Sequence, residues 1–298
     1  MRTLLITNSY DATSDILINE LGAASFIRLN FDLPRDWSIT LTPTDLNISS
    51  IHGSFNSDDI SKCIWRKPFI SKPDDVSFCE KFTQEEWKYT LYEIALLMQD
   101  QGKLYMNFPF ADYEVGKLKQ QRHAEHFFKL SKATVYANAK PVTNEPTIAK
   151  SLSGQTLSDG RVLYTTEVTS KELSEDIWYI QDLIKARFDL TVVYFYGEIF
   201  TFRLDRSKIS GLDWRKDQFE IVKEWDKVSL GHEFEACIEG FMNKMGLVYG
   251  RLDFLQPDAD DEPVFLEVNK NGQWAWLDPD KNNGLFTAMC KIYNPIEK

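Results

Sequence analysis

The sequence has few cysteines and no closely spaced pair of them. The four are spread along 298 residues, at Cys63, Cys79, Cys237 and Cys290. This spacing excludes a zinc knuckle and a thioredoxin-like redox motif. Isolated cysteines in a chain of this length are typical of buried free thiols in a reducing compartment, so we expect a cytoplasmic protein.

The sequence also lacks a long apolar run and an excess of basic residues. No segment approaches the roughly 18 consecutive apolar residues of a membrane helix, and the N-terminal apolar run is too short for a signal peptide. Lys and Arg number 34 against 45 Asp and Glu, which gives a formal net charge of −11 at pH 7. Because nucleic-acid binding depends on basic residues that neutralise phosphates, we expect neither a nucleic-acid nor a membrane partner.

The first third of the chain has the pattern of a doubly wound α/β domain. An apolar strand over residues 3–7 precedes a helix over 13–21, and a second strand follows over 26–29. Short links between strand, helix and strand are typical of parallel α/β units. The first loop lacks GxGxxG, which excludes the dinucleotide-binding fingerprint at this position. A further strand over 63–65 and a helix over 83–101 follow.

The rest of the chain alternates short strands with two more helices. Asp112 as a helix cap predicts one of them over residues 113–130, and apolar spacing predicts the other over 233–245. Gly197 and Glu198 are typical of a hairpin turn between two apolar runs. The expected strands are residues 147–150, 162–168, 178–184, 190–196, 199–204, 219–225, 247–255 and 264–268.

The last two strands carry the residues with the clearest chemistry. Strand alternation puts Arg251 and Asp253 on one face of the first strand. In the second strand, Glu267 and Asn269 share a face, and Phe265 is expected to share it too. An acidic turn joins the strands, so antiparallel pairing would bring the polar side chains together.

Two interpretations of this polar cluster are open. Carboxylate and amide oxygens suit Mg²⁺, and an adjacent arginine stabilises a phosphoryl group during transfer. The alternative is a solvated hairpin whose outward face is polar. The apolar residues on both sides of Glu267 favour partial burial, and therefore a metal site, because a buried carboxylate needs a partner.

This stretch also resembles a known enzyme family. RLDF followed by FLEVN is similar to the metal-binding signature of ATP-grasp ligases, and GQWAWLD resembles the ATP-grasp maturases of microviridin-type peptides (graspetides). The resemblance is strong over residues 251–276 and moderate over 117–189. It implies an ATP-grasp fold of the α/β (α+β) class. Its expected parts are an N-terminal doubly wound α/β domain (1–112), a small central domain (113–184) and a C-terminal antiparallel-sheet domain with the metal site (185–298).

The resemblance implies ATP and Mg²⁺ as cofactors and assigns residues to them. Asp253, Glu267 and Asn269 would hold the metal, and Arg251 and Arg215 would be catalytic. The implied nucleotide-binding residues are Lys117 and Lys150 for the phosphates, the loop from Ser151 to Gly154 that closes over them, Gln181, Asp182, Leu183 and Ile184 for adenine, and Asp189 for the ribose.

The implied substrate is acidic, which makes arginines candidates for binding it. Arg66 and Arg203 are weaker candidates than Arg251 and Arg215, and the alternative is that both form surface ion pairs. The sequence departs from the family pattern at Thr191, where many relatives have arginine. Arg203 is a candidate to replace that arginine.

The activity that the resemblance implies is ATP-dependent macrocyclisation. The enzyme would phosphorylate Asp or Glu side chains of a ribosomally made precursor peptide, which has a leader and an acidic core. Ser or Thr would then form esters, or Lys would form amides. Two alternatives are an ATP-grasp ligase for small amino acids or a protein tail, and a catalytically silent ATP-binding module. A homodimer is also implied.

Overall fold

The computed structural model describes residues 1–298 except 67–80, 143–145, 153–163, 170–171 and 297–298. Two compact units are distinguished by their internal contacts: a first unit, Met1–Ala111 with Gln273–Lys298, and a second unit, Asp112–Gly272. The three-domain division expected from the sequence stays a prediction. Within the described residues, no helix combines the length and apolarity that crossing a bilayer requires.

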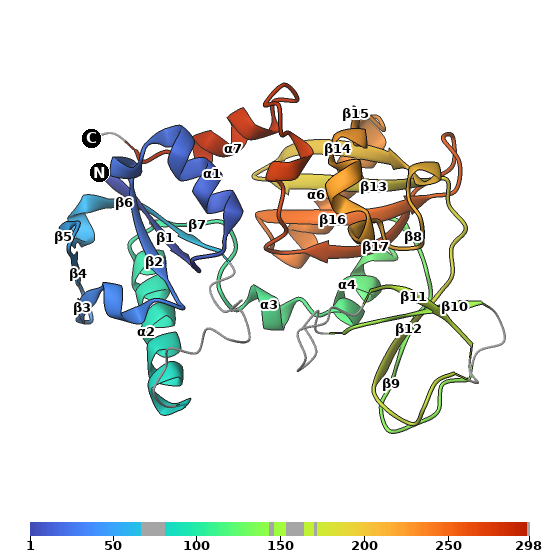
Figure 1. Ribbon diagram of the computed structural model, residues 1–298, viewed down its shortest axis with the longest axis horizontal. Helices are drawn as coiled ribbons and strands as arrows, with labels where there is room; N and C mark the ends of the chain where they lie inside the picture. The colour runs from blue at the N-terminus through green and yellow to red at the C-terminus, as the bar shows by residue number, and fades with distance from the viewer. Residues whose placement is uncertain (67–80, 143–145, 153–163, 170–171, 297–298) are drawn as a thin grey trace. The chain divides into compact units, whose positions relative to one another are not determined.

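The first unit is built around a parallel four-stranded sheet (Figure 1). Its main elements are β1 (Arg2–Thr7), α1 (Ala12–Leu21), β2 (Phe26–Asn30), β6 (Ile60–Trp65), α2 (Lys81–Asp100), β7 (Leu104–Tyr105) and α7 (Leu285–Tyr293). The strand order is β2-β1-β6-β7, and β1 pairs in parallel with both of its neighbours. This arrangement confirms the β–α–β pattern predicted from the sequence.

Apolar side chains bury both faces of this sheet. Leu4 and Ile6 of β1 join Leu91 and Met98 of α2 in one core cluster. Leu5 is equally buried and, because side chains alternate along a strand, it faces the opposite side. Burial on both faces is typical of parallel sheets, which need helices on each side.

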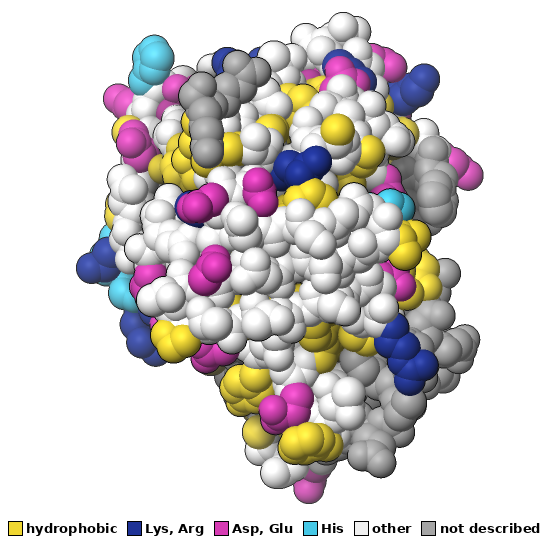
Figure 2. Space-filling model, turned by 90° about the vertical axis from the view of Figure 1, so that its left-hand side faces the viewer, with side chains coloured by type: hydrophobic (Ala, Val, Ile, Leu, Met, Phe, Trp, Pro, Cys, Tyr) yellow, Lys and Arg dark blue, Asp and Glu magenta, His cyan; other side chains and the backbone are white. Residues whose placement is uncertain are grey.

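A small antiparallel sheet, which the sequence analysis did not identify, lies between β2 and β6 in the chain. It consists of β3 (Ser38–Leu41), β4 (Leu46–Ser50) and β5 (Gly53–Asn56). One face contributes Leu46 and Ile48 to the core. The other face carries small polar side chains at Ser38, Thr40, Asn47, Ser49, Ser54 and Asn56. Figure 2 views the molecule from the side on which Figure 1 shows β3, β4 and β5, and much of the surface on that side is uncharged.

The second unit contains two sheets (Figure 1). The larger one has six strands: β8 (Lys129–Leu130), β13 (Phe188–Phe195), β14 (Glu198–Asp205), β15 (Asp226–Val228), β16 (Tyr249–Gln256) and β17 (Val264–Asn269). Their order is β15-β14-β13-β16-β17-β8, and all pairs except β17–β8 are antiparallel. The predicted hairpin at Gly197 and Glu198 and the predicted pairing of the last two strands are confirmed.

The smaller sheet consists of β9 (Ala133–Tyr136), β10 (Thr147–Lys150), β11 (Thr166–Val168) and β12 (Trp178–Asp182), in the order β11-β10-β12-β9. Ala149, Leu173 and Ile180 form its apolar cluster. Side chains at alternate positions, including Lys150, Tyr179 and Gln181, therefore face away from that cluster.

Helix α6 (His232–Met245) covers one face of the six-stranded sheet. Phe241 of this helix packs edge-to-face on Phe265 of β17, with ring centroids 5.1 Å apart. Phe128 packs between the same elements, 5.2 Å from Phe254 of β16. This aromatic core leaves the opposite face of β16 and β17 for polar side chains.

Two predicted elements of the second unit are wrong. The helix expected over 113–130 is interrupted: α3 (Ala111–Glu114) is followed by Gly116, which caps α4 (Lys117–Ala124), and residues 129–130 form β8. The strand expected over 219–225 is instead α5 (Gln218–Ile221) with a 3₁₀ turn, and the strand β15 follows it. Ile221 and Trp225 are buried at helical spacing, which a reading by apolar content alone misses.

Candidate active site

The polar face of the six-stranded sheet carries the residues singled out in the sequence. Across β16 and β17, Arg251 pairs with Asn269 and Asp253 pairs with Glu267. Residues that are directly opposite in an antiparallel pair share a face. The four side chains therefore gather on one face, as the sequence analysis predicted. Thr191 of β13 lies opposite Asp253 on its other side.

The expectation that Phe265 shares this face is wrong, because a β-bulge intervenes. Asp253 pairs with Glu267, but the next residue, Phe254, pairs with Phe265. Leu266 is the extra residue of the bulge. It shifts the alternation of side chains by one position, so that Phe265 and Glu267 face opposite sides of the sheet. Phe265 consequently points into the aromatic core, 5.5 Å from the ring of Phe254, while Glu267 points to the polar face.

Asp253 is fixed by three hydrogen-bond donors. Its Oδ1 accepts from Thr191 Oγ1 at 2.5 Å, and its Oδ2 accepts from Asn269 Nδ2 at 2.8 Å. Arg251 donates to the same Oδ2 at 3.2 Å. Thr191, which stands where the family resemblance leads us to expect arginine, thus helps to orient the Asp253 carboxylate.

Two lysines surround the second carboxylate, Glu267. Lys117, the first residue of α4, lies 2.9 Å from Glu267 and donates to the backbone oxygen of Ser151 at 3.0 Å. Burial by itself raises the pKa of Glu267, but the charges of Lys117 and Lys150 hold it down to about 2. Burial lowers the pKa of Lys150, and the nearby Lys117 charge lowers it further, against the attraction of Glu267.

The smaller sheet turns two further polar groups to the same side as Lys150. Tyr179 is its direct partner in β12, and the Tyr179 ring centroid lies 5.4 Å from the Lys117 ammonium. Gln181 lies two residues further along, with 1% exposure, and its Nε2 has no hydrogen-bond partner among the described residues. A buried amide that donates to no described residue is a candidate to bind a ligand.

The segment expected to bind adenine has two of its backbone amides already engaged. Asp182 donates its N–H to the oxygen of Lys132 at 3.1 Å, and Leu183 donates to the oxygen of Pro146 at 3.1 Å. Adenine binding by Gln181, Asp182, Leu183 and Ile184 stays a prediction, and it would use other groups of this segment. Of the loop expected to close over the phosphates, Ser151 to Gly154, residues 153 and 154 lie outside the described residues.

Arg215 is held by its neighbour Asp213. Its Nε donates to Asp213 Oδ1 at 2.8 Å, and the terminal nitrogen Nη2 donates to Oδ2. The Asp213 side chain is 4% exposed, whereas that of Arg215 is 46% exposed. Asp213 foremost, and Glu267 and Asp253 with it, raise the pKa of Arg215, so its guanidinium lies in the field of the two site carboxylates.

Asp189, expected at the ribose, forms an ion pair that the sequence analysis missed. Arg206 donates to both of its oxygens, at 2.9 Å and 2.7 Å. Burial raises the pKa of Asp189 to about 6, against the opposing charge of Arg206. Contact with a ribose stays a prediction for this residue.

Arg203 does not join the cluster. It is paired with Leu190 in the strand register, one position away from the pair that contains Thr191. Successive residues of a strand face opposite sides, so Arg203 lies on the other face from Asp253. Its guanidinium packs over the ring of Phe188 at 4.6 Å. This position contradicts the expectation that Arg203 replaces an arginine at Thr191.

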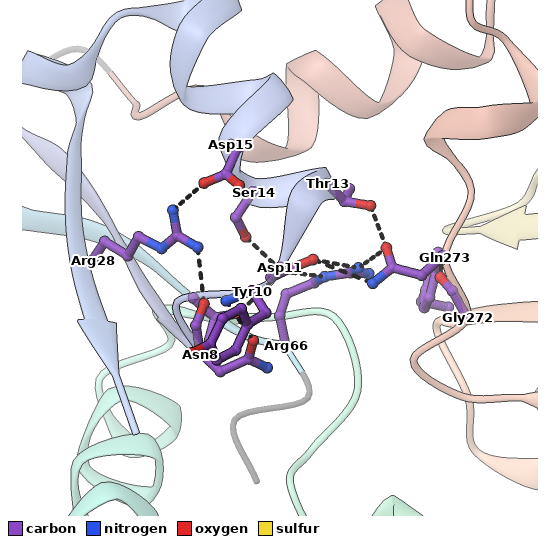
Figure 3. Close-up of polar contacts among 12 residues, drawn as sticks. Asn8, Tyr10, Asp11, Thr13, Ser14, Asp15, Arg28, Arg66, Gly272 and Gln273 are labelled. Carbon is purple, nitrogen blue, oxygen red and sulfur yellow. Dashed lines mark hydrogen bonds and ion pairs between the residues drawn. The ribbon is translucent and has the colours of Figure 1, made fainter. Parts of the chain in front are cut away.

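Arg66, the other weak substrate candidate, belongs to the first unit and is fully buried. Its Nη2 donates to Gln273 Oε1 at 2.8 Å, and its guanidinium pairs with Asp11 at 3.4 Å (Figure 3). Burial opposes ionisation of Asp11, but the Arg66 charge and a hydrogen bond from Ser14 hold its pKa well below the usual range. The alternative of a surface ion pair is therefore wrong, and substrate binding by Arg66 stays a prediction.

The donor set at Asp253 suits a hard divalent cation. Two carboxylates directly opposite each other repel unless a cation neutralises them, and Asn269 adds an amide oxygen. No group of three His, Cys, Asp or Glu side chains is arranged for metal binding in the described part of the chain. A set with only two carboxylates matches Mg²⁺, which keeps several waters and binds substrate phosphates.

Gly272 allows the chain to pass close to this cluster. A Cβ at this position would lie 2.6 Å from Cβ of Arg251 and 3.3 Å from Cβ of Asn269. We expect Gly272→Ala to destabilise the protein by about 1–3 kcal/mol, because overpacking displaces the strand ends. Denaturant unfolding measures this loss. Gly211→Ala is the control, since a Cβ there has open space, and equal stability of the two variants would contradict the prediction.

No protein-family model matches the chain, and no curated protein matches it. Solved structures do match. An ATP-grasp ligase from Chryseobacterium gregarium, RiPP-associated and in complex with ADP and a leader and core peptide, has 21% identity and a TM-score of 0.80, covering 98% of this chain and 95% of that chain. Macrocyclase MdnC from Microcystis aeruginosa, bound with precursor peptide MdnA, has 18% identity and a TM-score of 0.79, covering 98% and 99%.

A more distant match is D-alanine–D-alanine ligase from Bacillus anthracis complexed with ATP. It has 13% identity and a TM-score of 0.51, with 91% of this chain and 86% of that chain covered. At these identities the likeness concerns the fold. The chain has the mixed α/β ATP-grasp fold that the sequence analysis expected.

Proposed function

We propose that this chain is an ATP-dependent ligase that forms ester or amide crosslinks in a ribosomally made precursor peptide. The observation that carries the proposal is the pair of carboxylates, Asp253 and Glu267, with Lys117, Arg251 and Arg215 around it. Such a cluster can neutralise the phosphates of ATP and still hold an acidic side chain. The similar folds solved with leader, core or precursor peptides support a peptide substrate.

The chemistry proceeds in two balanced steps. An Asp or Glu carboxylate of the peptide attacks the γ-phosphorus of ATP, which yields an acyl phosphate and ADP. A Ser or Thr hydroxyl, or a Lys amine, then attacks the acyl carbon and expels inorganic phosphate, so that each crosslink removes one water from the peptide. Phosphoryl transfer depends on positioning and charge neutralisation rather than on covalent catalysis by the protein.

The residues of this chain have separate roles in these steps. Lys117 and Lys150 bind the α and β phosphates, and Arg251 stabilises the transferred phosphoryl group. Arg215 pairs with the peptide carboxylate, since a planar guanidinium binds a carboxylate through two hydrogen bonds. Asp253, Glu267 and Asn269 would hold Mg²⁺, which would supply positive charge for the phosphate oxygens.

The nucleotide base and the remaining partners complete the proposal. Gln181 offers its buried side-chain nitrogen to adenine, together with groups of Asp182, Leu183 and Ile184. The loop expected from Ser151 to Gly154, whose residues 153 and 154 lie outside the described part of the chain, would exclude water from the acyl phosphate. The cytoplasmic location, the homodimer and the ribose contact of Asp189 stay predictions.

A mass measurement tests the function. We expect incubation with ATP, Mg²⁺ and the acidic, Ser/Thr- or Lys-containing peptide encoded beside the gene to reduce the peptide mass by one water per crosslink, with stoichiometric release of ADP. An unchanged peptide mass, with ADP formed on free amino acids, would support a small-molecule ligase instead. Absence of ADP with either substrate would support a silent ATP-binding module.

A further inference from the structure

The loop that carries Arg215 is tied to the sheet by an arginine that the proposed chemistry does not use. Arg206 donates from Nη1 to both oxygens of Asp189, at 2.9 Å and 2.7 Å. Its Nη2 donates to the backbone oxygens of Leu212 at 3.1 Å and Gly211 at 3.5 Å. One guanidinium thus joins a strand of the sheet to the loop over residues 206–217.

Asp189 is a rigid anchor for this contact. It lies in β13, opposite Leu204 of β14 on one side and Leu255 of β16 on the other. The same strand carries Thr191, which bonds Asp253 at 2.5 Å. Arg206 is therefore bonded to β13, the same strand whose Thr191 orients the Asp253 carboxylate.

Arg206 bonds the backbone oxygen of the residue that directly precedes Asp213, and Asp213 orients Arg215. Leu212 accepts from Arg206, and the next residue, Asp213, accepts from Arg215 and from the backbone N–H of Thr165 at 3.0 Å. The Asp213 side chain is nearly buried, whereas that of Arg215 is about half exposed. A chain of direct contacts thus runs from Asp189 to the exposed guanidinium.

We propose that Arg206, anchored by Asp189, is a positioning residue that sets Asp213 and Arg215 for recognition of the acidic peptide side chain. This inference rests on the proposed function, because Arg215 is there the group that reads the peptide carboxylate. It gives Asp189 a role in peptide recognition rather than in nucleotide binding. Both oxygens of Asp189 already accept hydrogen bonds from Arg206, which suits an anchor better than a ribose ligand.

Kinetics with the peptide encoded beside the gene test the inference. Arg206→Met is expected to raise the peptide KM by about tenfold or more and to leave the ATP KM within about twofold, because only peptide positioning is lost. This variant also leaves Asp189 buried without its ion pair, which is destabilising. The double variant Asp189→Asn with Arg206→Met also removes the unpaired Asp189 charge. It should be more stable than Arg206→Met alone but keep the high peptide KM.

A double-mutant cycle separates positioning from general destabilisation. Arg215→Lys should raise the peptide KM strongly in the wild-type background and little in the Arg206→Met background, since the arginine is already misplaced there. Arg187→Met is the control. The Arg187 side chain is 58% exposed and its ion pairs with Asp205 and Asp258 should add little to stability, so this variant should have the peptide KM of the wild type.

Additive effects of Arg206→Met and Arg215→Lys on the logarithm of the peptide KM would overturn the inference. A rise in the ATP KM of Arg206→Met, with no rise in its peptide KM, would overturn it too. A wild-type protein that never modifies the peptide would instead overturn the proposed function. In that case amide hydrogen exchange over residues 206–217 still decides on the tether. Arg206→Met should accelerate this exchange, and unchanged exchange would refute the positioning role.

Discussion

Glu267→Gln should reduce turnover on the order of 1000-fold while leaving the protein folded, because electrostatic stabilisation of the transferred phosphoryl group is lost. Glutamine has the shape of glutamate but no charge to offer a divalent cation or the lysines around it. Glu267 lies 2.9 Å from Lys117, and the two lysine charges hold its pKa near 2, so the carboxylate is ionised throughout the physiological range. ADP release with the peptide substrate measures the loss, and thermal unfolding checks the fold.

Asp253→Asn should have a similar effect for a related reason. The Asp253 carboxylate accepts from Thr191, Asn269 and Arg251 at once, and an amide, with one oxygen only, cannot accept from all three. The variant therefore loses both the charge and the orientation of the site. A higher Mg²⁺ requirement for the residual activity would be expected of both variants.

The matched control for both variants is Glu262→Gln. Glu262 lies in the turn between the same two strands, 3.3 Å from Lys129, and both side chains are more than half exposed. Exposed ion pairs contribute little to folding stability, and Glu262 lies outside the proposed site, so the turnover and stability of this variant should equal those of the wild type. A near-normal rate for Glu267→Gln, or an equal loss for Glu262→Gln, would show that the assignment of the carboxylate pair is wrong.

Periodicity alone predicted the parts of the fold that depend on local pattern. The alternation along residues 249–256 and 264–269 was enough to place Arg251, Asp253 and Asn269 on one face. The same rule failed at Phe265, because a bulge is a property of two paired strands and leaves no mark in either strand alone. The interrupted helix after residue 112 has a clearer local signal, since Gly116 is a poor residue for a helix interior.

Contacts between distant segments could not be predicted from sequence. Arg66 directly follows an apolar strand, and a surface ion pair was one of its two interpretations, yet its partners are Asp11 and Gln273, which are far away in the chain. Arg206 likewise finds Asp189 across a strand pair, where only the register brings them together. The sequence thus shows which residues are charged. Tertiary packing decides which of them form buried ion pairs, as Arg66 and Arg206 do, and which remain accessible to ligands.

The lysines show how such a site differs from a purely structural ion pair. Lys150 is partly buried beside a second cation, Lys117, and burial lowers its pKa, so its charged form is disfavoured by the fold. A structural role would not select this arrangement, because a lysine whose pKa is lowered on folding costs stability in its charged form. An anionic ligand that arrives between the lysines and binds both would offset this cost.

Lys150→Met should therefore lower activity without lowering stability. Methionine keeps the length and the apolar stem of the side chain but removes the ammonium group. We expect the ATP KM to rise and kcat/KM for ATP to fall on the order of 100-fold, because one cation of the phosphate site is lost. The free energy of unfolding, measured without nucleotide, should be equal to or higher than that of the wild type. Lys132→Met is the control, since Lys132 is exposed beside the same sheet and both quantities should stay unchanged. An unchanged ATP KM in Lys150→Met, or a clear loss of stability, would show that this lysine supports the fold rather than the nucleotide.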